Sequence, residues 1–231
     1  MAYLLYGVVK EPVVAGAAIE GLKGKELSFV ADHGLCAAVS ELDAEEGAPP
    51  VAELLTYARV VEALHRRQAV VPMRYGCFLN GIPAIGDVLK NRQHQYHTLL
   101  DELEGHVEMG IRLLIPKTEA PPLQADPVVN GLGYLTRQRV HYQMQEETAQ
   151  GRQGLIDSYL QAFAGLYARH RAETDVKKDA VILSLYFLTP ENAISRFREI
   201  FGRVAKNGGA KAMLSGPWPP YNFVAPDLVA S

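Results

Sequence analysis

Residues 181–188 (VILSLYFL) constrain the fold of this chain more than any other segment. The side chains of a strand point alternately to the two faces of a sheet, and nearly all of these are apolar. Such a run, with almost no polar residue, predicts a central strand. It is also too short to span a bilayer as a helix.

The patterns in the first part of the chain have the order β-β-β-α-β and predict an open α+β sandwich. His33 and Gly34 lie between two strand patterns and predict a tight hairpin turn. The predicted elements are strands over residues 3–9, 27–31 and 35–40, a helix over 51–67, and a strand over 69–74. The apolar stripe of that helix consists of Leu54, Leu55, Ala58, Val61 and Leu64.

The second part of the chain begins after a single helix predicted over residues 82–103, which Gly105 ends. Thr189 is expected to cap a later helix and Pro190 to occupy its first position. The other predicted elements are a strand over 107–115, a proline-rich linker over 116–127, mostly helix over 131–171, the strand over 181–188, a helix over 192–206 and a strand over 210–215. This β-α-β-α-β order resembles a ferredoxin-like sheet with one strand missing or contributed from elsewhere.

These patterns predict an α+β protein of two domains packed side by side. Residues 1–104 form an N-terminal α+β sheet domain, and residues 105–231 form a C-terminal ferredoxin-like domain with long helices and an extended aromatic and proline-rich tail. The helix over 82–103 has apolar positions that suit packing on either domain.

Composition and charge restrict the classes of partner. The 231 residues carry a formal net charge of −3, and basic and acidic residues are interspersed, so nucleic acid is not an expected partner. The N-terminus has no basic region before its apolar stretch and no small-residue cleavage site, which predicts a cytoplasmic protein without a membrane partner.

The segment 214–224 (LSGPWPPYNFV) combines prolines with large aromatic side chains. Pro217, Pro219 and Pro220 hold the backbone extended, so the neighbouring aromatic rings can bury apolar area at little entropic cost. Two interpretations follow. The tail binds an apolar partner, or it packs onto its own C-terminal domain and closes that core, which is the favoured interpretation.

Seven histidines are present and offer candidate metal ligands. His94, His97 and Asp101 share one face of the helix predicted over 82–103 and are the best candidate ligands for a cation. They lack a fourth ligand and a recognised spacing, which favours a solvated helix face.

Arg74 and Tyr75 end a predicted strand beside Gly76 and suggest a corner that grips a ligand. Pairing of Arg74 with a carboxylate, such as Glu62 or Glu108, is the favoured alternative. Cys36 is expected in the core, whereas Cys77 follows Gly76 in a predicted turn and is expected to be more exposed.

The remaining polar groups predict no catalytic, cofactor-binding or metal-binding residue, and hence no enzyme. Gly131 and Gly133 lack the setting of a dinucleotide loop. A basic cluster has two interpretations: a docking face for an acidic partner, or a solvated helix face, which is the favoured one. It consists of Lys177, Lys178, Arg196, Arg198, Arg203 and Lys206.

An ordered set of sequence blocks resembles the gas vesicle GvpF/GvpL family. The blocks are YLLYGVV (3–9), GLCAAVSEL (34–42), HRRQAVVPMRYGCFL (65–79), LEGHVEMGIRLLI (103–115), GLGYLTRQR (131–139) and LSGPWPPYNFV (214–224). One departure is Gly76-Cys77-Phe78, where the family has a Gly-Thr or similar pair; it is conservative in size.

The resemblance implies a gas vesicle accessory protein, a minor component that acts in vesicle assembly and so in buoyancy. It implies contacts with the hydrophobic shell protein and other accessory proteins, limited shell-protein aggregation, no cofactor, and a location at the gas vesicle or in the cytoplasm. The alternatives are a small-molecule-sensing or enzymatic ferredoxin-like protein, and a structural component of the vesicle wall.

Overall fold

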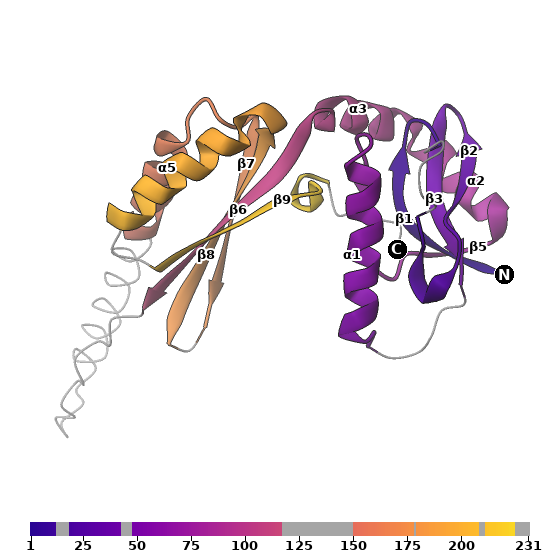
Figure 1. Ribbon diagram of the computed structural model, residues 1–231, viewed down its shortest axis with the longest axis horizontal. Coiled ribbons are helices and arrows are strands. Elements are labelled where there is room, and N and C mark those ends of the chain that lie inside the picture. The colour runs from indigo at the N-terminus through magenta and orange to yellow at the C-terminus, as the bar shows by residue number, and fades with distance from the viewer. Residues whose placement is uncertain (13–18, 43–47, 117–149, 178, 208–210, 225–231) are drawn as a thin grey trace, which may run out of the picture.

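Two antiparallel sheets, each with its own helices, make up the computed structural model of the protein (Figure 1). The structure describes residues 1–12, 19–42, 48–116, 150–177, 179–207 and 211–224. The first sheet contains β1 to β5 and the second contains β6 to β9.

The first sheet has the order β2-β3-β1-β4, and β5 also pairs with β1. The hairpin between β2 and β3 is confirmed. Asp32 pairs with Leu35, and His33 and Gly34 between them have φ of 51° and 71°, as a two-residue hairpin turn requires. The strand predicted over 69–74 is reduced to two residues. The strands are β1 (Ala2–Val9), β2 (Ser28–Asp32), β3 (Leu35–Glu41), β4 (Val71–Pro72) and β5 (Phe78–Asn80).

Helices lie on both faces of the first sheet. Helix α1 (Val51–His65) covers one face, and its buried side chains join those of β1 and β3 in one apolar cluster. Helices α2 (Gly81–Asn91) and α3 (Gln93–Leu103) bury their apolar side chains in the cluster on the other face.

The single helix predicted over 82–103 is wrong, because the chain leaves the helical conformation at Arg92, with φ −121° and ψ 17°. A straight helix of 22 residues would extend about 33 Å. The longest strand of this sheet has eight residues, which span about 27 Å. The break lets both shorter helices pack on the sheet.

The second sheet has the order β7-β8-β6-β9, with every pair antiparallel. Helical residues 150–162 connect β6 to β7, and α5 (Ile194–Asn207) connects β8 to β9. This β-α-β-β-α-β order confirms the ferredoxin-like prediction. Strand β8 is central, also as predicted. The strands are β6 (His106–Pro116), β7 (Arg169–Val176), β8 (Ala180–Pro190) and β9 (Lys211–Trp218).

Strand β7 is the strand that the sequence pattern lacked. All eight of its residues (RHRAETDV) are exposed, so it has no apolar alternation by which to recognise it, and helix was predicted for 131–171 instead. The predicted helix start at Thr189 is also wrong. Both Thr189 and Pro190 belong to β8, and the Thr189 hydroxyl donates to the Phe187 carbonyl at 3.4 Å instead of capping a helix.

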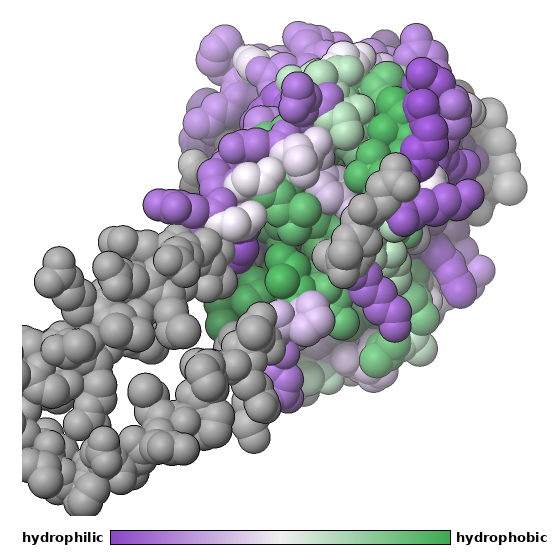
Figure 2. Space-filling model, turned by 90° about the vertical axis from the view of Figure 1, so that its left-hand side faces the viewer, coloured by the Kyte–Doolittle hydropathy of each residue, from purple (hydrophilic) through white to green (hydrophobic). Residues whose placement is uncertain are grey.

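One face of the second sheet packs against helical residues 150–162 and α5. Phe163, Phe187 and Phe197 meet at its centre, with ring centroids 4.2 to 5.5 Å apart. Figure 2 shows apolar side chains continuing to the surface between purple, hydrophilic regions on this side of the molecule. The predicted linker, apart from Pro116, and the predicted helix over 131–149 lie outside the described residues.

Candidate interaction surface

The apolar stripe of α1 does not lie where the sequence pattern placed it. The buried residues are Tyr57, Val60, Val61 and Leu64. Leu54 and Leu55 of the predicted stripe are instead 40% and 54% exposed, and Val51 is 71% exposed. Val51, Leu54 and Leu55, spaced i, i+3 and i+4, therefore form an outward apolar stripe on the first half of α1, which we call the α1 stripe.

The hydroxyl of Tyr57 explains this rotation of α1. It lies within hydrogen-bond distance of the backbone carbonyls of Leu5 (2.9 Å) and Met73 (3.0 Å), both on the sheet side of the helix. The ring of Tyr57 stacks on Tyr6 with centroids 5.0 Å apart, and Tyr75 meets it edge-on at 5.4 Å. A buried tyrosine needs a partner for its hydroxyl, so Tyr57 turns inward and the α1 stripe turns outward.

The second sheet has one face that its own helices leave open. Arg112, Ser184 and Glu173 lie in one row across β6, β8 and β7 on that face. With Tyr186 and other neighbours they line a shallow hollow of about 570 Å³. The carboxylates there have partners at its rim, since Glu173 pairs with Arg171 at 2.9 Å and Asp175 pairs with Lys177 at 2.7 Å.

The C-terminal tail does not close the core of the second sheet, so that prediction is wrong. Trp218 ends β9 and remains 43% exposed. Phe223 and Val224 are each only 5% exposed, but they belong to the apolar cluster of the first sheet, together with Leu5 and Leu100. The tail thus starts on one sheet and ends in the core of the other.

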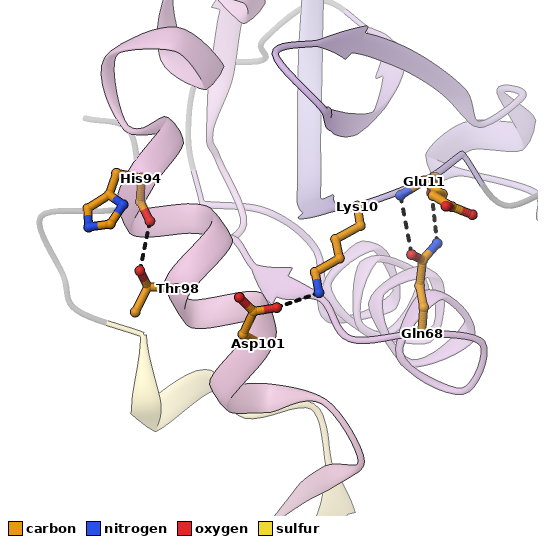
Figure 3. Close-up of polar contacts among 6 residues, drawn as sticks. All are labelled: Lys10, Glu11, Gln68, His94, Thr98 and Asp101. Atoms are coloured by element: carbon orange, nitrogen blue, oxygen red, sulfur yellow. Dashed lines mark hydrogen bonds and ion pairs between the residues drawn. The ribbon is translucent and has the colours of Figure 1, made fainter.

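The candidate cation ligands His94, His97 and Asp101 are not grouped as a metal site, and Figure 3 shows the contacts of His94 and Asp101. The carboxylate of Asp101 pairs with Lys10 at 2.5 Å, and this contact lowers the pKa of Asp101. The Nε2 atom of His97 lies 3.3 Å from the carbonyl of His33, and the carbonyl of His94 accepts from Thr98. Within the described ranges no three His, Cys, Asp or Glu side chains are grouped to hold a metal ion.

The corner at Arg74 and Tyr75 is part of the packing around α1. The Tyr75 hydroxyl donates to the Glu53 carboxylate at 3.0 Å. The predicted partners of Arg74 are otherwise engaged, since Glu62 pairs with Arg66 and Glu108 accepts from Asn222. The predicted pairing of Arg74 is therefore wrong. None of these residues lines the hollow on the second sheet.

The other candidates are placed as follows. Cys36 is in the core as predicted, and burial raises the pKa of its thiol. Cys77 is also buried, against expectation. On α5, Arg196 and Arg203 both pair with Glu199, which suits the solvated-face interpretation. Lys178, Gly131 and Gly133 lie outside the described residues.

No helix in the described part of the chain has the length and apolar character needed to cross a membrane. Comparison with known proteins gives a consistent result over nearly the whole chain. Residues 2–225 match the family model of the gas vesicle synthesis protein GvpL/GvpF.

Two curated gas vesicle proteins are similar in sequence. The chain is 21% identical over 224 residues to gas vesicle protein F1 of Halobacterium salinarum, covering 95% of this chain and 91% of that protein. It is 20% identical over 226 residues to gas vesicle protein F of Haloferax mediterranei, with coverage of 95% and 91%.

Two crystal structures share the fold. GvpF from Microcystis aeruginosa superposes with a TM-score of 0.80 at 14% identity, covering 97% of this chain and 99% of that one. GvpF from an Anabaena species gives a TM-score of 0.77 at 15% identity, with coverage of 97% and 96%. At these identities the likeness establishes the arrangement of both sheets.

Proposed function

Because the chain belongs to the GvpL/GvpF family of gas vesicle synthesis proteins, we propose that it acts in vesicle assembly by binding the hydrophobic shell protein and limiting its aggregation. The observation that carries this proposal is the α1 stripe. Val51, Leu54 and Leu55 expose apolar surface side by side on a well-anchored helix. Exposed apolar patches of this kind mark interaction sites.

The α1 stripe suits an apolar partner for geometric reasons as well. Residues at i, i+3 and i+4 lie on one side of a helix and pack against an apolar face of another chain. Tyr57 fixes the rotation of α1, so the stripe is presented before a partner arrives. A surface that is already ordered loses little entropy on binding. Arg59 and Glu62 follow the α1 stripe along the same helix, and their charges would orient a partner that binds there.

The proposed role requires no chemical turnover. The carboxylates nearest the hollow on the second sheet are ion-paired, which suits a structural or docking use more than acid–base chemistry. We also propose that residues 1–104 and 105–231 act as two domains. The chain passes from α3 to β6 through Gly105, whose φ of 66° suits a sharp change of direction.

The test is co-purification of this protein with its partners from vesicle-forming cells, in both the gas vesicle fraction and the cytoplasmic fraction. The protein should recover the shell protein, together with other vesicle proteins, and should reduce light scattering by purified shell protein. Leu55→Asp should weaken both effects. Val176→Asp is the matched control, because Val176 is also exposed, at 59%, but lies on β7. If the shell protein is never recovered, the proposal fails.

The hollow of about 570 Å³ is the observation that favours a second candidate, a small-molecule-sensing protein. Arg112 and Ser184 would then bind a polar metabolite, and such a ligand should raise the melting temperature. Arg112→Ala should abolish that rise while leaving shell-protein binding intact.

The third candidate, a structural component of the vesicle wall, is distinguished by washing purified vesicles. A wall component would stay with washed vesicles, whereas an assembly factor would be removed.

A further inference from the structure

Glu108 on β6 is a buried carboxylate whose two oxygens both hold the C-terminal tail. Its side chain is 4% exposed. One oxygen accepts the backbone N–H of Asn222 at 2.8 Å, and the other accepts the Asn222 side-chain amide at 2.6 Å. Hydrogen bonds to a carboxylate are stronger than neutral ones, and a buried carboxylate requires them. Asn222 is therefore fixed to the second sheet.

The next two residues of the tail are fixed to the first sheet. Phe223 and Val224 are buried in the cluster that also contains Leu5 and Leu100. Strand β7 holds the same stretch from the other side. The Arg169 guanidinium lies 5.8 Å from the centre of the Phe223 ring, and Arg171 donates to the Asn222 carbonyl at 3.5 Å.

Other contacts also cross the junction: Leu188 of β8 is buried in the same apolar cluster, and Tyr186 packs against that cluster. The chain itself passes from α3 to β6 through Gly105, and the Gly105 carbonyl accepts the N–H of Glu191 at 2.9 Å. Arg169 pairs with Glu102 at 2.9 Å, but both side chains are about half exposed, so this ion pair contributes little. The burial of Phe223 and Val224 contributes more than these polar contacts and adds to the burial of Leu188.

We propose that residues 219–224 form a strap that sets the angle between the two sheets. Glu108 fastens the strap to β6, and Phe223 and Val224 anchor its end in the core of the first sheet. When Glu108 releases Asn222, the strap is no longer fastened to β6, and the two halves can turn about Gly105. This inference stands apart from the proposed function, since it involves no partner.

The protein carries a natural reporter for the strap. Trp218 is the only tryptophan in the sequence, and it lies four residues before Asn222. In the Glu108→Ala variant, hydrogen exchange of the peptide over 219–224 should accelerate about tenfold or more, because both acceptors are lost. Acrylamide quenching of Trp218 should also change. Glu199→Ala removes an exposed carboxylate from α5 and is the control, for which neither measurement should change.

The angle itself is measured by energy transfer between dyes on cysteines at Arg59→Cys on α1 and Lys211→Cys on β9. The native Cys36 and Cys77 are buried, so only the introduced thiols should react. In the Glu108→Ala background the distance distribution should broaden while far-ultraviolet circular dichroism stays the same. Unchanged exchange of 219–224 together with an unchanged distance distribution would overturn the proposal.

A second variant decides the matter if Glu108→Ala does not fold. In Asn222→Asp two carboxylates meet, so they repel at about pH 7 and share a proton at about pH 5. The groups around them are Arg171 and Glu173 on β7 and Tyr221 on the strap. Trp218 quenching should therefore report a released strap at the higher pH and a fastened strap at the lower. Equal quenching at both pH values would contradict the strap.

Discussion

The hydroxyl of Tyr57 on α1 donates a hydrogen bond to the carbonyl oxygen of Leu5 on β1 at 2.9 Å. This contact fixes which side of α1 faces the sheet, and so which side faces outward. Burial raises the pKa of Tyr57 well above its usual value, so the hydroxyl keeps its proton and the bond persists in mildly alkaline solution. The exposure of Leu54 and Leu55 is thus a consequence of one buried phenol group.

Tyr57→Phe should lower the free energy of unfolding by about 1–2 kcal/mol, because backbone carbonyls lose a buried donor. Urea denaturation would measure this. Tyr167→Phe is the matched control, since the Tyr167 hydroxyl makes only a long contact of 3.4 Å with the Leu160 carbonyl and is less buried. Equal losses in the two variants would show that the Tyr57 hydroxyl has no special role.

Phe223→Ala should lower the free energy of unfolding by about 3–4 kcal/mol, because Phe223 is 5% exposed within a core cluster. Trp218→Ala should cost less, about 1 kcal/mol, because 43% of Trp218 is exposed. Chemical denaturation of both variants checks the order. A larger loss from Trp218→Ala would mean that the ring seals the second sheet after all.

Glu108→Gln should change how stability depends on pH. Burial is the largest cause that raises the pKa of Glu108, and the Asn222 hydrogen bonds oppose it. A raised pKa in the folded state means that the fold binds this proton more readily than the unfolded chain does. The contribution of Glu108 to stability is therefore greatest below the usual value of 4.5 and is lost as the pH rises through the raised pKa.

The Gln variant should lack this part of the pH dependence. At about pH 7 it should be as stable as the parent chain or more so, because Gln is neutral and a flipped Asn222 amide restores both hydrogen bonds. Urea denaturation at about pH 7 and near pH 4.5 measures the difference between the variant and the parent chain. If that difference is the same at both pH values, the carboxyl does not titrate as described.

His65 should affect the pH dependence of stability in the opposite direction to Glu108. Its two ring nitrogens are buried and have no hydrogen-bond partner in the part of the chain that the structure describes, and burial lowers the pKa of the ring. Glu191 opposes this shift only in part. A lowered pKa means that stability is present above the usual value of 6.5 and falls as the pH drops below it.

His65→Leu should therefore remove the loss of stability between about pH 7 and about pH 5.5 and should not destabilise the neutral protein. Thermal unfolding at the two pH values measures this. His94→Leu is the control, because His94 is exposed on α3 and should leave the pH dependence as it is. A steeper fall for His65→Leu than for the parent chain would contradict the assignment.

The sequence predicted the elements whose apolar pattern matches their burial. The run 181–188 became the central strand β8, which pairs with β6 along one edge and with β7 along the other; Val181, Leu183, Leu185 and Phe187 are buried, whereas Ile182, Ser184 and Tyr186 line the open face. Strand β7 was missed because an exposed edge strand needs no apolar residue; its backbone pairing with β8 alone defines it. The break at Arg92 depends on the size of the sheet underneath, which a local pattern does not contain.

The candidate surface was less predictable than the fold. Helix α1 has apolar residues on two sides, and either side could face the sheet. Which side does so depends on the carbonyls of Leu5 and Met73, which lie far away in sequence. The tail posed a similar problem. Its aromatic residues indicate that the tail is buried somewhere, but most of the cluster that contains Phe223 comes from the N-terminal part of the chain. Glu108, one of the two partners predicted for Arg74, instead accepts hydrogen bonds from Asn222.

The order of strands in the second sheet also bears on how the protein is made. Strand β6 needs β9 along one edge, and the two are separated by nearly a hundred residues of chain. All strands of the first sheet have been synthesised at β5, so they can pair on the ribosome before the second sheet is made, and Phe223 and Val224 join this core at the end. The second sheet must wait, with one edge of β6 unpaired, until β9 emerges. Long-range pairing of this kind is slow, so this half of the chain is where synthesis leaves the protein most open to misfolding.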